Sequence, residues 1–110
     1  MAQTKTMKAI KYLQKRLEES GVRITRIVLF GSHAAGTATE DSDIDLVIIS
    51  PDFRGKDIFK RAVMTGMAER RTIKKFMVPF DIITMTPEEF DSGRSVIADY
   101  AQQGITVYAA

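Results

Sequence analysis

The stretch from Ile27 to Ile49 reads IVLFGSHAAGTATEDSDIDLVII, and it decides the predicted fold. A β-branched and apolar run leads into Gly31-Ser32, and Asp43-Ile44-Asp45 follows after ten residues at the start of a second apolar run. Short runs of this composition, bounded by small and polar residues, favour strands. We therefore predict strands at 24–30 and 44–49, joined by a polar loop.

Two aspartates share one face of the second predicted strand. Side chains alternate along a strand, so Asp43 and Asp45 point to one face and Ile44 to the other. Two neighbouring carboxylates repel each other and resist burial unless a cation binds between them. Mg²⁺ or Mn²⁺ suits hard oxygen ligands, and Mg²⁺ usually takes one or two protein carboxylates together with water and substrate phosphates. We therefore predict that Asp43 and Asp45 bind a divalent metal.

A third aspartate, Asp81, lies in the apolar run Phe80-Asp81-Ile82-Ile83. An aspartate inside such a run is unfavourable unless it is paired. If this strand lies beside the second one, Asp81 joins the other two as a metal ligand and catalytic group. Three carboxylates can hold two metal ions about 4 Å apart, the geometry used for in-line phosphoryl displacement. The alternative is a structural ion pair between Asp81 and a nearby arginine.

Gly31-Ser32 is the predicted phosphate-binding turn. Glycine allows the backbone to approach a phosphate closely, and a helical turn at 33–35 would aim free N–H groups at its oxygens. The Ser32 hydroxyl adds one more bond, while Ser42 either braces the loop or contacts the same ligand. A phosphate site beside a metal site is what nucleotidyl transfer from a triphosphate requires.

Hydrophobic periodicity predicts the remaining elements. An amphipathic first helix contains Met7 and Leu17, with Thr4 or Thr6 as its cap and Gly21 at its end. The other predicted elements are a helix at 57–71 with Ile58, Ala62, Met64 or Thr65, and Ala68 at helical intervals, a strand within 76–85, a helix starting at Thr86-Pro87-Glu88-Glu89, a helix at 96–103 and a strand at 105–108. This order predicts an α/β (α+β) fold with a single mixed β-sheet and helices packed on it.

Composition predicts one domain, residues 1–110, with 45% apolar and 27% charged residues. The absence of cysteine excludes disulfides and thiolate metal sites. No window approaches the roughly 20 apolar residues of a membrane span, and residues 1–8 lack the apolar core of a secretory signal. We therefore expect no membrane partner and a cytoplasmic location. The net charge of +2 does not call for nucleic acid as a partner.

With these motifs in place, the sequence resembles the minimal nucleotidyltransferases (MNT) of the DNA polymerase β superfamily. The resemblance covers nearly the whole chain and is carried by Gly31-Ser32, Ser42-Asp43-Ile44-Asp45-Leu46 and Phe80-Asp81-Ile82-Ile83. It implies a polymerase β-like nucleotidyltransferase fold, ATP as donor and Mg²⁺ or Mn²⁺ as cofactor. In MNT antitoxins it further implies transfer of AMP to a hydroxyl, a tyrosine of a HEPN-domain partner.

The resemblance also implies roles for individual residues. Asp43 and Asp45 would bind metal and nucleotide phosphates, Asp81 would hold the second metal and help deprotonate the acceptor, and Gly31 and Ser32 would bind the triphosphate. Many relatives have arginine directly after Gly-Ser and again before the next glycine, where this chain has His33 and Ala35. Two phosphate contacts are therefore lost or weakened, which bears on turnover rate more than on metal binding.

Two other functions stay open. One is a non-catalytic antitoxin that neutralises its toxin by binding alone, which the missing arginines suggest. The other is a small-molecule modifier similar to the catalytic half of the aminoglycoside nucleotidyltransferases, whose helical domain is absent here. A chain of 110 residues has little surface for an acceptor pocket, so a partner or a homo-oligomer must hold the acceptor.

Several residues outside the motifs are assigned structural roles. His33 is predicted to be a surface residue, with a place near the substrate as the alternative. The basic residues Arg70, Arg71, Lys74 and Lys75 are predicted to form a solvated helix end, with attraction of ATP or of an acidic partner face as the alternative. The methionines, including Met64, Met67, Met77 and Met85, are predicted to fill the core.

Overall fold

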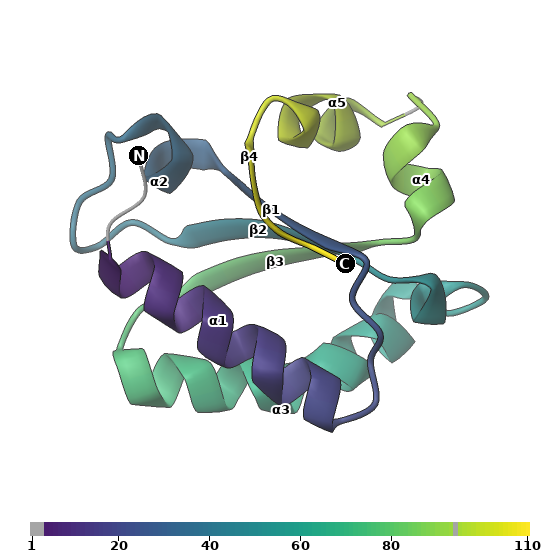
Figure 1. Ribbon diagram of the computed structural model, residues 1–110, viewed down its shortest axis with the longest axis horizontal. Coiled ribbons are helices and arrows are strands. Elements are labelled where there is room, and N and C mark those ends of the chain that lie inside the picture. The colour runs from purple at the N-terminus through teal and green to yellow at the C-terminus, as the bar shows by residue number, and fades with distance from the viewer. Residues whose placement is uncertain (1–3, 94) are drawn as a thin grey trace.

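A four-stranded mixed sheet with helices on both faces forms the centre of the computed structural model, which describes residues 4–93 and 95–110 (Figure 1). The strands lie in the order β3 (Phe80–Met85), β2 (Ile44–Ile49), β1 (Arg26–Phe30) and β4 (Ile105–Ala109). β1 is antiparallel to both of its neighbours, and β2 is parallel to β3. The helices are α1 (Thr4–Glu19), α2 (Gly31–Ala35), η1 (Pro51–Phe53), α3 (Ile58–Phe76), α4 (Pro87–Asp91) and α5 (Val96–Gln102). The predicted α/β class, single mixed sheet and order of elements are confirmed.

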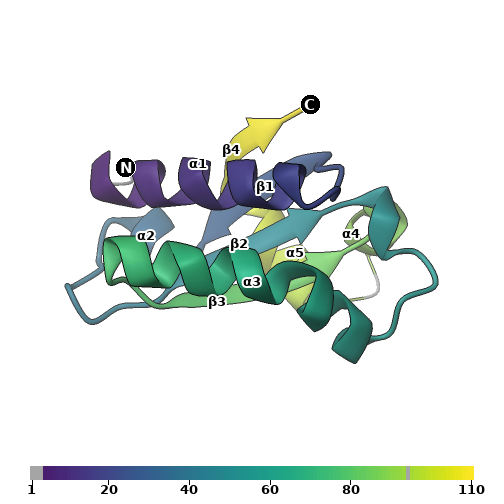
Figure 2. The ribbon, with the colours of Figure 1, turned by 90° about the horizontal axis from the view of Figure 1, so that it is seen from below.

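α1 and α3 lie side by side, in opposite directions, across one face of the sheet (Figure 2). The even-numbered side chains of β2 point toward them, because side chains alternate along a strand. Ile44, Leu46 and Ile48 are fully buried in one cluster with Leu13 and Leu17 of α1. Each such side chain contributes roughly 1.5–3 kcal/mol when it is buried, so this layer fixes β2 in register.

The other face of the sheet is only partly covered. α4 and α5 pack on it through Phe90 and Ala98, which bury Val47 and Ile49 of β2. Asp45 lies on the same face at the start of β2, beyond the reach of these short helices, and is half-buried. The fold therefore leaves one end of this face open, beside α2.

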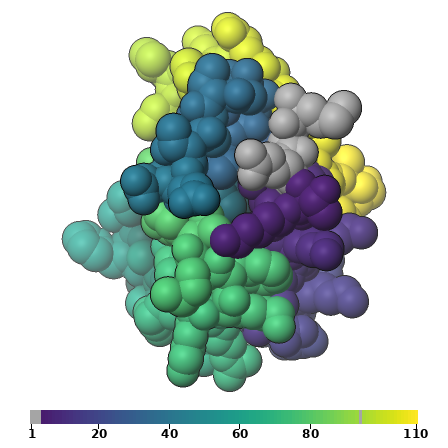
Figure 3. Space-filling view, turned by 90° about the vertical axis from the view of Figure 1, so that its left-hand side faces the viewer, coloured from purple at the N-terminus to yellow at the C-terminus, as the bar shows by residue number. Residues whose placement is uncertain are grey.

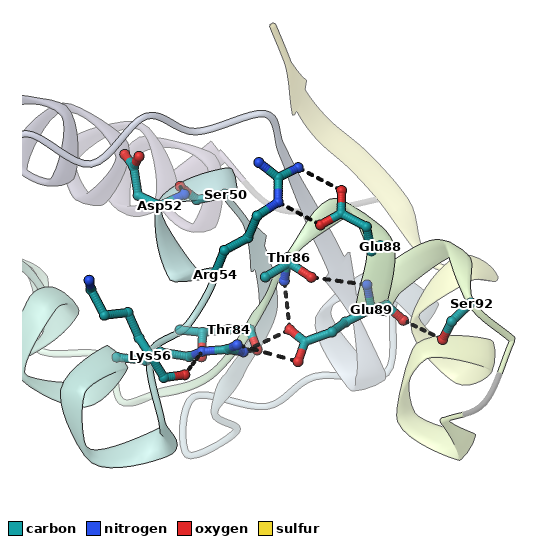
Figure 4. Close-up of polar contacts among 10 residues, drawn as sticks. Ser50, Asp52, Arg54, Lys56, Thr84, Thr86, Glu88, Glu89 and Ser92 are labelled. Carbon is teal, nitrogen blue, oxygen red and sulfur yellow. Dashed lines mark hydrogen bonds and ion pairs between the residues drawn. The ribbon is translucent and has the colours of Figure 1, made fainter.

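α4 begins with a complete capping box. The Thr86 hydroxyl accepts from the Glu89 N–H at 3.0 Å, and the Glu89 carboxylate accepts from the Thr86 N–H at 2.8 Å (Figure 4). Glu89 also pairs with Arg61 of α3 at 2.8 Å, and Glu88 pairs with Arg54 at 2.6 Å. Burial alone would raise the pKa of Glu89, but the hydrogen bonds from Arg61 and the Thr86 N–H lower it overall. The two ion pairs therefore link α4 to Arg54 and to α3.

One sequence-based detail is wrong. Thr6 lies within α1 and is buried, so it does not cap the helix. The helix predicted at 57–71 is confirmed as α3, and its buried side carries Thr65, Ala68 and Thr72, whereas Ile58 and Ala62 are exposed. Periodicity identified this helix, but only packing shows which of its sides faces the core.

The methionine prediction is also wrong in part. Met85 is buried, but Met67 and Met77 are exposed. Met77 ends α3 in the left-handed conformation, with φ of 55°, so its side chain projects away from the helix. The basic residues Arg70, Arg71, Lys74 and Lys75 are exposed, as predicted. Among the described helices, none is long and apolar enough to cross a membrane.

The capping box predicts the effect of Thr86→Ala. Loss of the N-cap hydroxyl should lower the free energy of unfolding by about 1 kcal/mol, measured by urea titration at pH 7. Thr86→Ser loses the same buried methyl group but keeps the hydroxyl, so it should be destabilised clearly less than Thr86→Ala. Equal destabilisation by both substitutions would show that the Thr86 methyl group, and not the cap, matters.

Candidate active site

The end of β1 and the starts of β2 and β3 meet at one end of the sheet. Asp45 of β2 lies opposite Asp81 of β3 in the parallel register, and opposite Phe30 of β1 on its other side. Residues opposite each other in neighbouring strands project to the same face, so Asp45 and Asp81 are neighbours. The prediction that the third strand lies beside the second is confirmed. Asp81 is exposed, which leaves it accessible to a ligand.

The carboxylates of this end of the sheet are electrostatically coupled. Burial raises the pKa of Asp45 above its usual value, and repulsion from Asp81 and then from Asp43 raises it further. His33 acts in the opposite direction and lowers this pKa. Asp43 therefore stands close enough to affect Asp45, although it precedes the first residue of β2. The structure brings together the three aspartates that the sequence singled out.

Gly31 is required where it meets Asp45. Its φ of +71° is left-handed, and a Cβ built there would overlap the Asp45 carboxylate. Any other residue would both strain the backbone and displace that carboxylate. The Gly31 backbone is thus packed against the Asp45 carboxylate. Gly31 and Ser32 open α2, and its N-cap residue, Phe30, makes no side-chain capping bond, so no N-cap side chain satisfies the N–H groups of the first turn.

The aspartate carboxylates fit an ion such as Mg²⁺, which takes some of its ligands from the protein and the others from water and substrate. Within residues 4–93 and 95–110, no group of three or more acidic or histidine side chains is arranged to hold a metal by itself. Mg²⁺ does not need such a cage, because it usually takes one or two carboxylates and completes its octahedron with water and phosphate oxygens. Paired carboxylates that repel each other, beside free N–H groups, match this requirement.

His33 is buried inside the fold, so the prediction of a surface residue is wrong. Its Nε2 lies 3.1 Å from the Ser42 carbonyl oxygen, and its Nδ1 lies 3.2 Å from the Thr6 hydroxyl. A carbonyl can only accept, so Nε2–H donates to Ser42, and in the neutral ring Nδ1 accepts from Thr6. His33 thereby joins α1 to the residue that precedes Asp43. Nothing in the sequence links Thr6 to His33, since their contact depends on the packing of α1.

Ser42 braces the loop that leads to Asp43. Its hydroxyl accepts from the Thr39 N–H at 2.9 Å and lies 3.3 Å from the Thr39 hydroxyl. With its carbonyl bound to His33, Ser42 is held at both its side chain and its backbone. Figure 3 faces this end of the molecule, where α2 and the following loop lie above the end of α3.

Two features of this region were missed from the sequence. Glu69 of α3 adds a fourth carboxylate near the group: burial raises its pKa, Arg70 lowers it, and repulsion from Asp81 raises it. A cavity of about 210 Å³ also adjoins the turn, lined among others by Gly31, Phe30 and Tyr100. Both depend on how α3 and α5 pack, which local sequence does not encode.

Comparison with known proteins agrees with this geometry. The sequence profile described as "Nucleotidyltransferase domain" matches residues 7–103. The chain belongs to this family. The Methanocaldococcus jannaschii protein named "Putative protein adenylyltransferase MJ1305" is 39% identical over 72 residues, which cover 66% of this chain and 46% of that protein. The chain thus spans about half the length of this curated relative.

Solved structures share the nucleotidyltransferase fold of this domain. A protein of Sulfolobus solfataricus described as "a putative nucleotidyltransferase" superposes with a TM-score of 0.68 at 20% identity, over 92% of this chain and 78% of its own. A toxin–antitoxin complex with AMP-PNP gives 0.66 at 21%, over 94% and 73%. The Shewanella oneidensis complex of a tri-AMPylated HEPN toxin with its MNT antitoxin gives 0.53 at 15%, over 93% and 73%. At these identities the likeness shows the fold alone.

The coupled carboxylates predict the behaviour of Asp45→Asn in the nucleotidyltransferase domain. Without metal, the neutral side chain removes repulsion and should raise the free energy of unfolding by about 0.2–1 kcal/mol, the range for opposed cross-strand pairs. The measurement is urea unfolding in EDTA at pH 7. Mn²⁺ should raise the stability of the wild type more than that of the variant. A destabilised metal-free variant would contradict the inferred repulsion.

The buried imidazole predicts a second stability effect. His33→Leu leaves the Ser42 carbonyl and the Thr6 hydroxyl unpaired, so it should lower the free energy of unfolding by about 1–3 kcal/mol. Thr6→Ser retains the hydroxyl and serves as the matched control, with a loss of no more than about 0.8 kcal/mol for its buried methyl group. A His33→Leu protein as stable as the wild type would show that the bridge contributes nothing.

Proposed function

We propose that this chain is a Mg²⁺- or Mn²⁺-dependent adenylyltransferase that moves AMP from ATP to a hydroxyl of a partner protein. One observation carries the proposal: Asp45 and Asp81 are in register on adjacent strands, with Gly31 in contact with the Asp45 carboxylate. Membership of the nucleotidyltransferase domain family supports it. So does the adenylyltransferase name of the archaeal relative.

Each residue has a proposed task in this reaction. Gly31, Ser32 and the first N–H groups of α2 bind the triphosphate, while Asp43 and Asp45 would hold the metal. The metal would neutralise phosphate charge during attack on the α-phosphorus. Asp81 would be a metal ligand as well, and it accepts the proton of the attacking hydroxyl. The acceptor oxygen bonds to the α-phosphorus, the bond to the β-phosphate breaks, and pyrophosphate leaves.

Ser42 is proposed to contribute to the same nucleotide site. As a hydroxyl it has one proton to donate, and that proton is available to a phosphate when the Thr39 hydroxyl, 3.3 Å away, is the donor of their contact. Ser42 also contributes through the loop geometry.

The acceptor in this proposal is a tyrosine of a HEPN-domain protein. The Shewanella oneidensis MNT antitoxin is found with an AMPylated HEPN toxin, and the present chain shares its fold. The aspartates stand at the open end of the sheet, where a side chain from a second protein can reach them. In this proposal the partner supplies the pocket that holds the acceptor.

A non-catalytic antitoxin is the second candidate, and His33 favours it. His33 stands where many relatives place an arginine, and its two ring nitrogens are engaged with the Thr6 hydroxyl and the Ser42 carbonyl. It therefore makes no phosphate contact in this arrangement. In that case the chain would neutralise its partner by binding, with slow or no transfer.

A transfer assay separates these functions. The chain is incubated with ATP labelled at the α-phosphate, Mg²⁺ and the HEPN-domain protein expected from the neighbouring reading frame. Label should move to the partner, and Asp43→Asn or Asp81→Asn should reduce the rate by at least about 100-fold. Asp91→Asn, an exposed aspartate at the end of α4, is the control and should leave the rate unchanged.

Two results would count against the enzyme. One is an absence of label on the partner together with neutralisation of its toxicity that survives an Asp43→Asn, Asp45→Asn double substitution, which would establish the binding-only function. The other is transfer to an aminoglycoside without any partner protein, which would establish the small-molecule function.

A further inference from the structure

The outer side of α3 carries large apolar side chains that the fold does not cover. Phe59, Val63 and Met67 are 78%, 81% and 59% exposed. They are spaced four residues apart, so they form one row along two turns of the helix, which we call the outer stripe. Scattered exposed apolar residues are ordinary, but a continuous row of this kind marks an interaction surface.

The shape beside the outer stripe suits a helix. A shallow hollow of about 370 Å³ lies along it, lined by Phe59, Val63, Met64, Lys56 and Lys60. Its exposed lining is almost entirely apolar apart from the ends of the two lysines. Apolar anchors at four-residue spacing beside a hollow are the arrangement by which one amphipathic helix docks on another.

Charge indicates what kind of helix fits. Lys56 and Lys60 border the start of the outer stripe, and Arg70, Arg71 and Lys74 stand exposed beyond its other end. A second copy of this chain packed antiparallel would bring Lys60 of one copy toward Arg70 of the other, and a parallel copy would bring each cation toward itself. Like charges so placed cost several kcal/mol. A second copy is therefore disfavoured.

The two nearby carboxylates offset only part of the positive charge of Lys56, Lys60, Arg70, Arg71 and Lys74. Asp57 caps α3 by accepting from the Lys60 N–H at 2.8 Å. Glu69 is half-buried, with Asp81 close enough to raise its pKa. The outer stripe is therefore an apolar surface bordered by net positive charge.

We propose that the outer stripe of α3 docks an amphipathic helix of a partner protein whose apolar face is bordered by aspartate and glutamate. The outer stripe lies on the side of α3 away from the sheet, and the aspartates lie on the opposite face of that sheet. Docking and nucleotidyl transfer therefore use separate surfaces. This inference does not depend on the proposed adenylyl transfer and can be tested without it.

The test uses two synthetic helical peptides of about 18 residues with the same leucine face. One has glutamate on both borders of that face, and its twin has lysine there. Binding to the full chain is followed by fluorescence anisotropy at 100 mM salt. The glutamate peptide should bind at least about tenfold more tightly than the lysine peptide, and Val63→Glu should weaken that binding at least about tenfold.

Val96→Glu is the matched control, since Val96 is 86% exposed on α5, across the sheet from α3. It should bind the glutamate peptide like the wild type. Val63→Ser removes the anchor without adding charge and should also weaken binding. Circular dichroism and a cooperative urea unfolding transition confirm that each variant is folded.

Several outcomes would overturn the proposal. They are equal binding of both peptides, equal weakening by Val63→Glu and Val96→Glu, or no binding at about 1 mM glutamate peptide. A further one is a wild-type dimer, seen by sedimentation, that Val63→Glu dissociates, because a second copy would then occupy the outer stripe. Failure of the AMP-transfer assay, by contrast, would leave the peptide result unchanged.

Discussion

Repulsion between carboxylates is the constraint on which the open end of this molecule depends. Asp45 and Asp81 are held opposite each other because β2 and β3 are parallel and in register, and the pKa of Asp45 is raised by burial and by its acidic neighbours. Burial of Ile44, Leu46 and Ile48 supplies the free energy that keeps this pair together. The fold thus holds Asp45 and Asp81 where their carboxylates repel each other, and a bound cation would reduce that repulsion. Shifted pKa values of this kind are frequent at functional sites.

At the same end of the molecule, the buried side chain of His33 joins α1 to the loop before Asp43. The Gly31 backbone sits against the Asp45 carboxylate, while His33, two residues later, reaches Thr6 of α1 and the Ser42 carbonyl. One short helix therefore fixes both the Gly31-Ser32 turn and the approach to Asp43. The role of His33 in this arrangement is structural, because both of its ring nitrogens are engaged within the fold.

The two faces of the sheet have different roles. α1 and α3 close one face into a continuous core, and α3 then turns an apolar row outward. α4 and α5 cover only part of the other face and leave the aspartates accessible. The proposed helix docking and the proposed nucleotidyl transfer would therefore use different sides of the molecule.

Local sequence was sufficient for the strands and for the chemistry they carry. The alternation of Asp45 with Ile44 and Leu46 identified β2 and its two faces, and Thr86-Pro87-Glu88-Glu89 identified the start of α4, because both signals lie within a few residues of the feature they specify. Local sequence could not predict the burial of His33, the exposure of Met67 or the approach of Glu69 to Asp81. Each is set by which side of a helix meets the sheet, and that choice is made by contacts between segments far apart in the chain. Sequence by itself determined which groups could do chemistry, and tertiary packing decided which of them meet, because only the folded sheet brings the ends of β1, β2 and β3 to one place.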